Sequence, residues 1–194
     1  MTEFKFEEFP KIARLNRECI ISEKIDGTNG QIIISDDGEI QAASRSCLIY
    51  PDRDNHGFAA WVRDNKGDLL TLGPGRHFGE WWGSGIQRKY GLTGDDKRFS
   101  LFNSFRWMDD AARPKCCHVV PVLFKGLFPT GAVEMCLEGL RSHGSQAAPG
   151  FIKPEGVVIW HIAAQVGFKV TLEKDSEWKG KSATAQGGSG GARE

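Results

Sequence analysis

The chain has 194 residues, a formal net charge of +0 at pH 7 and 40% hydrophobic residues. This length can bury one sizeable core, so a single domain is expected, and the neutral charge argues against a protein that coats nucleic acid non-specifically. No apolar run is long enough to cross a bilayer, and the N-terminus lacks a signal-peptide pattern. We therefore expect a cytoplasmic protein without a membrane partner.

Three consecutive strands are expected near the N-terminus. Residues 19–25 are apolar and β-branched, and residues 30–35 contain the run Gln-Ile-Ile-Ile. A turn at 36–38 then leads into a third strand at 39–46. The sharp connection between the first two strands falls on residues 26–29.

Two helices interrupt the strands. The first begins after Asp54 or Asn55, either of which can cap it, and is expected to end at Gly67. Its shared apolar face consists of Phe58, Trp61 and Val62. The second helix is expected over residues 131–143, with Thr130 at the N-cap and Gly144 following it. Its apolar stripe consists of Val133, Cys136, Leu137 and Leu140.

Further strands are expected at residues 77–82, 98–105, 119–124, 156–161 and 166–172. Because strands and helices do not alternate regularly, the pattern favours an α+β fold of mainly antiparallel sheets with flanking helices.

The C-terminal residues differ in composition from the rest. Residues 182–194 are rich in glycine and serine and cannot bury a core, so we predict a flexible tail there. Residues 1–181 are expected to form the single folded domain.

The five cysteines include no Cys-x-x-Cys pair. Adjacent Cys116 and Cys117 are poorly placed to ligate one metal ion together, and disulfides are rare in reducing compartments. We interpret all five as ordinary core or surface residues.

The most informative motif is Lys24-Ile25-Asp26-Gly27-Thr28-Asn29, at the end of a predicted strand. A lysine there sits on a rigid element, and the glycine allows a tight turn beside a ligand. Lysine is a nucleophile only when its amine is neutral, which desolvation or neighbouring cations favour. By itself, Lys-x-Asp-Gly favours an ordinary β-turn with an exposed lysine.

Five further motifs follow in order. They are Ser44-Arg45-Ser46, Phe78-Gly79-Glu80-Trp81-Trp82-Gly83, Leu101-Phe102-Asn103, Pro154-Glu155-Gly156-Val157-Val158-Ile159 and Phe168-Lys169-Val170-Thr171. Together with the lysine motif, this series resembles the covalent nucleotidyltransferases, specifically the phage-type and RNA-editing ATP-dependent RNA ligases. The resemblance covers residues 20–173. It implies a nucleotidyltransferase (adenylation) domain, in the host cytoplasm if a phage encodes it.

The resemblance implies a three-step ligation of RNA ends. Lys24 would attack the α-phosphate of ATP and become lysyl-AMP, the AMP would pass to a 5′-phosphate end, and a 3′-hydroxyl would displace it. Glu155 would organise a magnesium ion, or manganese in its place, near Lys24. Lys169 would neutralise the α-phosphate. Because these are phosphoryl transfers, the protein mainly positions groups and offsets charge.

The same resemblance implies a nucleotide site. Glu80 would hold the ribose hydroxyls or a metal ion, and Phe102 would stack on the adenine, although Phe99 or Phe105 could take that part. Arg45 would offer a planar donor fork to phosphate or ribose oxygens. Glu23 and Ile25 would also lie at the nucleotide.

Two features of the motifs leave alternatives open. Asn29 could bind a phosphate or close an Asx turn. The bulky pair Trp81 and Trp82 could form a base-stacking platform or simply pack.

The fifth motif departs from the family pattern, which often carries a second lysine where this chain has Thr171. Lys153, Lys174 or Lys179 could compensate for the missing charge. No accessory nucleic-acid-binding domain is expected after Glu173, which suggests modest affinity for RNA or a partner protein that presents the ends. The best candidates for phosphate contacts are Arg88, Lys89, Lys97, Arg98, Arg106, Arg113 and Lys115.

The residues leave three other functions open. A minimal ATP-dependent DNA ligase shares the same chemistry and would act on DNA ends. A weakly active adenylate-binding or end-binding module is favoured by Thr171. A guanylyltransferase is the third, weaker, alternative.

Overall fold

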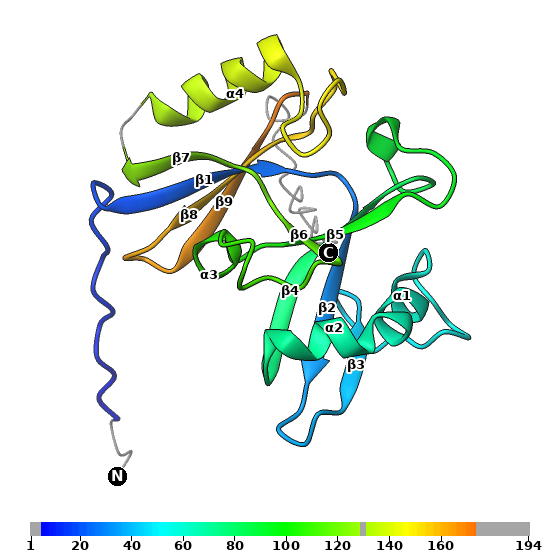
Figure 1. Ribbon diagram of the computed structural model, residues 1–194. Coiled ribbons are helices and arrows are strands. Elements are labelled where there is room, and N and C mark those ends of the chain that lie inside the picture. Colours follow the sequence, from blue (N-terminus) through cyan, green and yellow to red (C-terminus); the bar gives the residue numbers. More distant parts are fainter. Residues whose placement is uncertain (1–4, 129–130, 174–194) are drawn as a thin grey trace, which may run out of the picture.

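The structure is a computed structural model that describes residues 5–128 and 131–173. Two β-sheets form the body, and short helices cover their outer faces (Figure 1). All but one of the strand pairs are antiparallel; the exception joins β5 and β6. The expected α+β class with mainly antiparallel sheets is therefore confirmed.

The four-stranded sheet has the strand order β7-β1-β8-β9. Its strands are β1 (Glu18–Lys24), β7 (Val122–Leu127), β8 (Gly156–His161) and β9 (Val166–Thr171). Helix α4 (Ala132–His143) covers one face (Figure 1). The buried residues that join the helix to the sheet are Cys19, Ile21, Ala132, Cys136, Leu137, Leu140, Val157 and Ile159. The opposite face of this sheet carries the end of β1 with Lys24.

The five-stranded sheet has the strand order β3-β2-β4-β5-β6. Its strands are β2 (Thr28–Ile34), β3 (Ile40–Ala43), β4 (Gly75–Gly83), β5 (Lys97–Leu101) and β6 (Cys117–Val119). Helices α1 (Phe58–Asp64) and α2 (Lys66–Leu69) lie beside it, followed by the 3-10 turn η1 (Leu70–Leu72). Phe58, Val62 and Leu69 of these helices pack with Ile32, Trp81 and Phe99 of the sheet.

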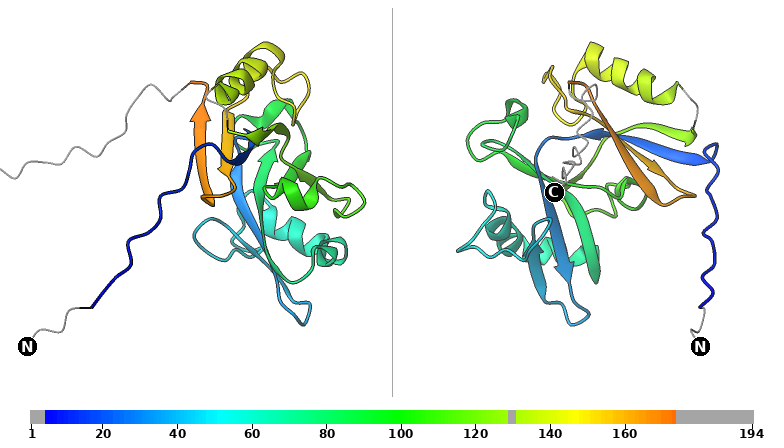
Figure 2. Two further views of the ribbon diagram at one scale, coloured as in Figure 1. Left: turned by 90° about the vertical axis from the view of Figure 1, so that its left-hand side faces the viewer. Right: turned by 180° about the vertical axis from the view of Figure 1, so that it is seen from behind.

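The lysine motif is the passage from one sheet to the other. β1 ends at Lys24 and β2 begins at Thr28, so the chain changes sheets within three residues (Figure 2). Gly27 lies so close to β4 that a Cβ atom there would be 2.4 Å from the carbonyl oxygen of Trp81. Any larger residue would push the two sheets apart at the motif.

The helix predictions were partly right. The N-cap residue of α1 is Gly57 and not Asp54 or Asn55, although the carboxylate of Asp54 does accept hydrogen bonds from the first-turn amides of Ala59 and Ala60. Gly67 does not end that helix: α1 ends at Asp64, and Gly67 lies within α2. Helix α4 was predicted almost to the residue, whereas its expected cap, Thr130, lies outside the described residues.

Two strand predictions were wrong in their extent. The strand expected at 98–105 ends at Leu101, because the side chain of Asn103 accepts a hydrogen bond from Arg106 and starts α3 (Ser104–Trp107). The strand expected at 119–124 is two strands, β6 and β7, in different sheets. Pro121, which has no amide to donate to a ladder, stands between them.

The residues before β1 extend away from both sheets (Figure 2). Residues 5–17 contain no helix or strand, and only near β1 does this segment contact the sheet, where His161 Nε2 is 2.9 Å from the carbonyl oxygen of Leu15. Among the described helices, none has the length and apolar character needed to span a membrane. The predicted tail, residues 182–194, lies outside the described residues.

Candidate active site

Lys24 and Glu155 form an ion pair at the edge of the four-stranded sheet. Lys24 Nζ donates to Glu155 Oε2 at 2.5 Å, although the two residues are 131 positions apart in the chain. The register explains this contact: Lys24 pairs with Gly156 across β1 and β8, and Glu155 immediately precedes it. The side chains are 22% and 17% exposed, so solvent screens this pair less than a surface ion pair.

Gly156 is required by the packing of β8 against β9. Its φ is +155°, and a Cβ atom there would lie 2.1 Å from the carbonyl oxygen of Val170. The glycine of the fourth motif therefore lets β9 close against β8 directly beside Lys24.

Glu80 bridges the two sheets at the lysine motif. It lies on β4, is 8% exposed, and accepts hydrogen bonds from the amide of Gly27 at 3.0 Å and from Asn29 Nδ2 at 3.1 Å. Burial raises the pKa of Glu80 to about 7, and the repulsion from Glu155 adds to this rise. The charge of Lys24 and the two hydrogen bonds oppose it. Lys24, Glu155 and Glu80 thus form one charged cluster.

Asn29 belongs to the strand rather than to a turn. It is the second residue of β2 and pairs with Glu80 across β2 and β4. Its side-chain amide donates to the Glu80 carboxylate, so the Asx-turn alternative does not describe its conformation. A phosphate contact by Asn29 remains a prediction.

A hollow of about 230 Å³ opens beside this cluster on the five-stranded sheet. It is lined by Asn29, Gly30, Gln31, Ser44, Arg45, Phe78 and Phe102. Phe102 is 43% exposed and can present a ring face to a ligand, whereas Phe99 is fully buried in the core. Phe105 is exposed but does not line the hollow. Of the three phenylalanines weighed from the sequence, only Phe102 both lines the hollow and is accessible.

Arg45 reaches the hollow from a tight turn that follows β3. The amide of Ser44 donates to the carbonyl of Cys47 at 2.8 Å, which closes the turn and holds Arg45 at its tip. Arg45 lines the hollow together with Phe102. Its contact with a nucleotide stays a prediction. The sequence did not indicate that Phe78 and Gln31 line this hollow, because a strand pattern does not show which face of a sheet will carry a pocket.

Lys169 lies on the same face of the four-stranded sheet as Lys24. The row Lys24, Gly156 and Thr171 crosses β1, β8 and β9, and the next row on that face is Ser22, Val158 and Lys169. Side chains two positions apart on a strand point to the same side, so both lysines face away from α4. Thr171, at the place of the second family lysine, stands in the same row as Lys24.

Glu23 has its side chain on the opposite face. It is 1% exposed and accepts hydrogen bonds from Ser145 Oγ at 2.5 Å, from the amide of Gln146 at 2.8 Å and from that of Ala147 at 3.0 Å. Burial raises the pKa of Glu23, and these hydrogen bonds oppose that rise. Ile25 is also buried, in an apolar cluster. Any nucleotide contact by these two residues would have to come from their backbone.

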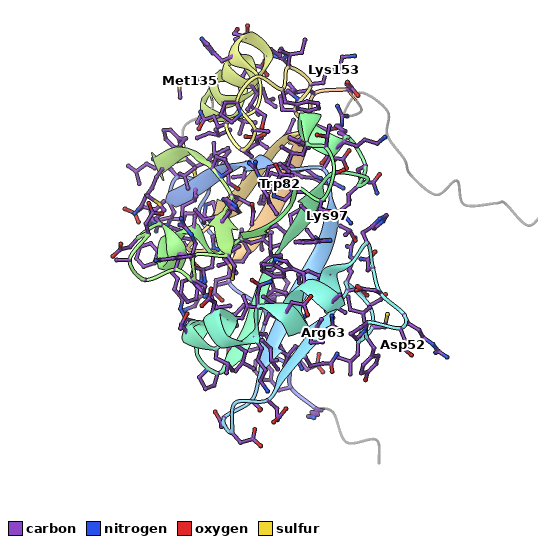
Figure 3. All side chains as sticks on the ribbon, turned by 45° about the vertical axis from the view of Figure 1, so that its right-hand side comes forward. Asp52, Arg63, Trp82, Lys97, Met135 and Lys153 are labelled. Atoms are coloured by element: carbon purple, nitrogen blue, oxygen red, sulfur yellow. The ribbon has the colours of Figure 1, made fainter. Side chains whose placement is uncertain are left out.

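The tryptophan pair packs rather than forming a platform. Trp81 and Trp82 are 2% and 1% exposed, and Figure 3 shows Trp82 in the middle of the molecule. The indole of Trp82 donates to Ser100 Oγ at 2.9 Å, which satisfies its polar atom in the core. Neither ring presents a face on which a base could stack.

Several of the predicted phosphate contacts already have partners within the chain. Arg98 pairs with Asp96, Arg113 pairs with Asp110, and Lys97 donates to the carbonyl of His56. Arg88 pairs with Asp26 and Glu173. Whether any of these side chains contacts RNA stays a prediction.

The sequence did not indicate that Arg88 and Tyr90 contact the lysine motif. The Tyr90 hydroxyl accepts a hydrogen bond from the amide of Asp26 at 3.0 Å and lies 3.4 Å from the carbonyl oxygen of Lys24. No sequence signal marks a lone tyrosine 66 positions away as a neighbour of the lysine motif. Only the course of the loop after β4 brings it there.

The carboxylates of Glu155 and Glu80 suit a divalent ion that keeps part of its hydration shell. Among the described residues there is no cluster of three or more histidine, cysteine, aspartate or glutamate side chains that could hold a metal alone. Glu155 and Glu80 are two carboxylates in one charged cluster. Magnesium is usually held in this way, by one or two carboxylates together with waters and substrate phosphates.

The fold resembles known RNA ligases. A Naegleria gruberi RNA ligase variant with ATP and Mn aligns with a TM-score of 0.58 and 21% identity, over 81% of this chain and 50% of that one. Another variant, with AMP and Mn, aligns with a TM-score of 0.58 and 19% identity over the same shares. This chain spans about half the length of these structures, and at such identities the likeness concerns the fold.

The sequence profile of the RNA ligase family matches residues 17–171, which include the lysine motif and the other five motifs. No curated protein matches the chain. The profile covers most of the chain, and the two sheets and the site residues fall within it. The chain therefore belongs to the RNA ligase family.

Proposed function

We propose that this protein is an ATP-dependent RNA ligase that joins 5′-phosphate and 3′-hydroxyl ends through a lysyl-AMP intermediate on Lys24. The observation that carries the proposal is the position of the Lys24 amine. It contacts Glu155, it shares a charged cluster with Glu80, and that cluster adjoins the hollow lined by Arg45 and Phe102. A nucleophile, a charged cluster and a stacking surface are thus adjacent.

In the first step the Lys24 amine attacks the α-phosphorus of ATP. A nitrogen–phosphorus bond forms, the bond from that phosphorus to the bridging oxygen breaks, and pyrophosphate leaves with the electron pair. The amine must first lose a proton, and Glu155 Oε2 at 2.5 Å is placed to accept it. In the second step an oxygen of the RNA 5′-phosphate attacks the same phosphorus, the nitrogen–phosphorus bond breaks, and Lys24 leaves as an amine that has taken up a proton.

In the third step the 3′-hydroxyl of the other RNA end attacks the activated 5′-phosphate and releases AMP. The attacking hydroxyl loses its proton as the new phosphodiester forms. All three steps are in-line displacements at phosphorus, so the role of the site is to align groups and to offset charge.

ATP and a divalent metal ion, Mg²⁺ or Mn²⁺, are the proposed cofactors. Glu155 and Glu80 would hold the ion, and the bound ion would offset the charge of the leaving pyrophosphate. Arg45 and Phe102 line the hollow where the nucleoside would bind, with Phe102 against the adenine. Lys169, on the face of Lys24, would offset charge on the α-phosphate. Glu23 and Ile25 would contact the nucleotide through their backbone.

RNA ends are the proposed partners. A partner protein that presents these ends would supply part of the RNA-binding surface.

The test is incubation with ATP labelled at the α-phosphate, in the presence of Mg²⁺ or Mn²⁺, followed by denaturation. Covalent, acid-labile label is expected on the wild-type chain and none on Lys24→Ala, after any AMP already present has been removed with pyrophosphate. Ligation of nicked duplexes with an RNA or a DNA strand at the 3′-hydroxyl side then measures the preference. Binding of ATP without covalent label would contradict the proposal and favour an adenylate-binding module. Labelling by GTP instead would contradict the choice of nucleotide.

A further inference from the structure

The loop after β4 reaches back across the molecule to the lysine motif. Three of its residues adopt left-handed backbone conformations that non-glycine residues seldom take: Gln87 at φ 42°, Lys89 at φ 60° and Tyr90 at φ 49°. Ile86 and Tyr90 are buried at 0% and 2% exposure and fix the loop at both ends. A strained loop that is pinned so firmly is typical of segments that place a particular side chain.

The side chain placed between these two anchors is Arg88. Its Nε donates to Asp26 Oδ2 at 3.2 Å, two residues after the nucleophile. Its Nη1 donates to the carbonyl of Lys153 at 3.1 Å, two residues before Glu155. Its Nη2 donates to Glu173 Oε2 at 2.9 Å, four residues after Lys169. One guanidinium thus contacts all three segments that carry the proposed catalytic residues.

We propose that Arg88 is a positioning residue for the adenylylation of Lys24. The inference rests on the proposed function. Arg88 holds the segments of Lys24, Glu155 and Lys169 in one fixed arrangement, so that the amine, its carboxylate partner and the phosphate-facing lysine are aligned before ATP binds.

The geometry of arginine is needed for this role. Its planar group offers donors in several fixed directions, and here they reach a carboxylate on one side, a carbonyl on another and a second carboxylate on a third. A lysine would keep the charge but would present it at a single nitrogen. Arg88→Lys should therefore keep the electrostatic part of the interaction and lose the link among the three segments.

The experiment measures single-turnover formation of lysyl-AMP over a range of ATP concentrations for wild type, Arg88→Ala and Arg88→Lys. For Arg88→Ala we expect the maximal rate to fall on the order of 10-fold to 100-fold, because small misplacements of reacting groups have effects of that size. The ATP concentration at half-maximal rate should stay within about 3-fold of wild type, since an interaction made away from the substrate leaves binding largely intact. Arg88→Lys should lie between the two.

Arg141→Ala is the matched control. Arg141 also makes several ionic hydrogen bonds, with Glu134 and Glu138, but these lie on α4. Removal of the Arg141 side chain should leave the adenylylation rate unchanged. A loss of rate in Arg88→Ala then reflects the contacts of Arg88 and not the loss of an arginine with several hydrogen bonds in general. Glu173→Gln weakens one of the three links and should cause a smaller loss. Added to Arg88→Ala, it should cause a smaller loss than it causes in the wild type, because the two residues share one contact.

Three results would overturn the proposal. The first is a wild-type rate of lysyl-AMP formation in Arg88→Ala. The second is a loss of ATP affinity without a loss of rate, which would make Arg88 a phosphate contact. The third is full additivity of the rate losses of Arg88→Ala and Glu173→Gln. If wild type itself takes up no label, the proposed function fails instead. Hydrogen exchange then tests the link by itself. Arg88→Ala should speed exchange of the amides near Asp26 and Glu155 and leave exchange of the α4 amides unchanged. Equal exchange in wild type and Arg88→Ala would refute the link.

Discussion

The two sheets of this protein contribute different things to one site. The four-stranded sheet carries Lys24, and Glu155 stands immediately before β8, so the strand register brings the two together. The five-stranded sheet carries the hollow, which is also lined by the exposed ring of Phe102, the residue that follows β5. Under the proposed function, the first sheet would supply the lysine–carboxylate pair, and the second would supply the surface for the nucleoside. This comparison teaches that changes in one sheet should alter rate and changes in the other should alter affinity.

The largest expected effect is that of Glu155→Gln in the four-stranded sheet. The amide keeps the shape of the side chain but removes the charge and the proton acceptor beside Lys24. We expect the rate of lysyl-AMP formation to fall by about 100-fold or more, as for loss of a general base. Single-turnover labelling measures this change. Equal rates in the two proteins would remove Glu155 from the chemistry.

The next effect is that of Phe102→Ala in the five-stranded sheet. Loss of base stacking costs about 1–3 kcal/mol, which corresponds to roughly 5-fold to 150-fold weaker ATP binding. Calorimetric titration with ATP and Mg²⁺ measures it, and Phe102→Tyr, which keeps the ring, is the control. If Phe102→Ala binds ATP normally but labels slowly, the division between the sheets breaks down.

Glu23 and Lys24 are adjacent yet point to opposite faces, so they make a sharp comparison within one sheet. Glu23→Ala leaves one buried donor, Ser145 Oγ, and two part-buried amides without their acceptor, and we expect a loss of roughly 2–4 kcal/mol in the free energy of unfolding. Lys24→Ala should change stability far less. Urea unfolding of both variants measures the difference. The comparison fails if Lys24→Ala is as unstable as Glu23→Ala.

The smallest effect concerns pH and Glu80, which lies where the sheets meet. Its pKa of about 7 in the folded protein is raised above the ordinary value of 4.5. A raised pKa contributes stability that is fully present below about pH 4.5 and is lost as the pH rises through about 7. The thermal midpoint should therefore fall between pH 5 and pH 8, and fall less in Glu80→Gln. Parallel slopes in the two proteins would mean that Glu80 titrates normally.

Much of the fold could be predicted from the sequence because local patterns dictate it. The apolar stripe of α4 fixed its extent, and the lysine motif was placed at a strand end where β1 does end. Where prediction failed, a single polar or proline residue overrode the apolar run. Asn103 turned the end of a predicted strand into α3, and Pro121 divided another into β6 and β7.

The sequence by itself determined the order of the motifs and the residue types that phosphoryl transfer needs, since these depend on short spacings and side-chain chemistry. It could not place Arg88 or Tyr90 against the lysine motif, nor separate the accessible Phe102 from the buried Phe99. Those facts depend on which faces of two sheets meet and how a distant loop folds back. Contacts between residues far apart in the chain follow from packing of the whole domain, and no local pattern records them.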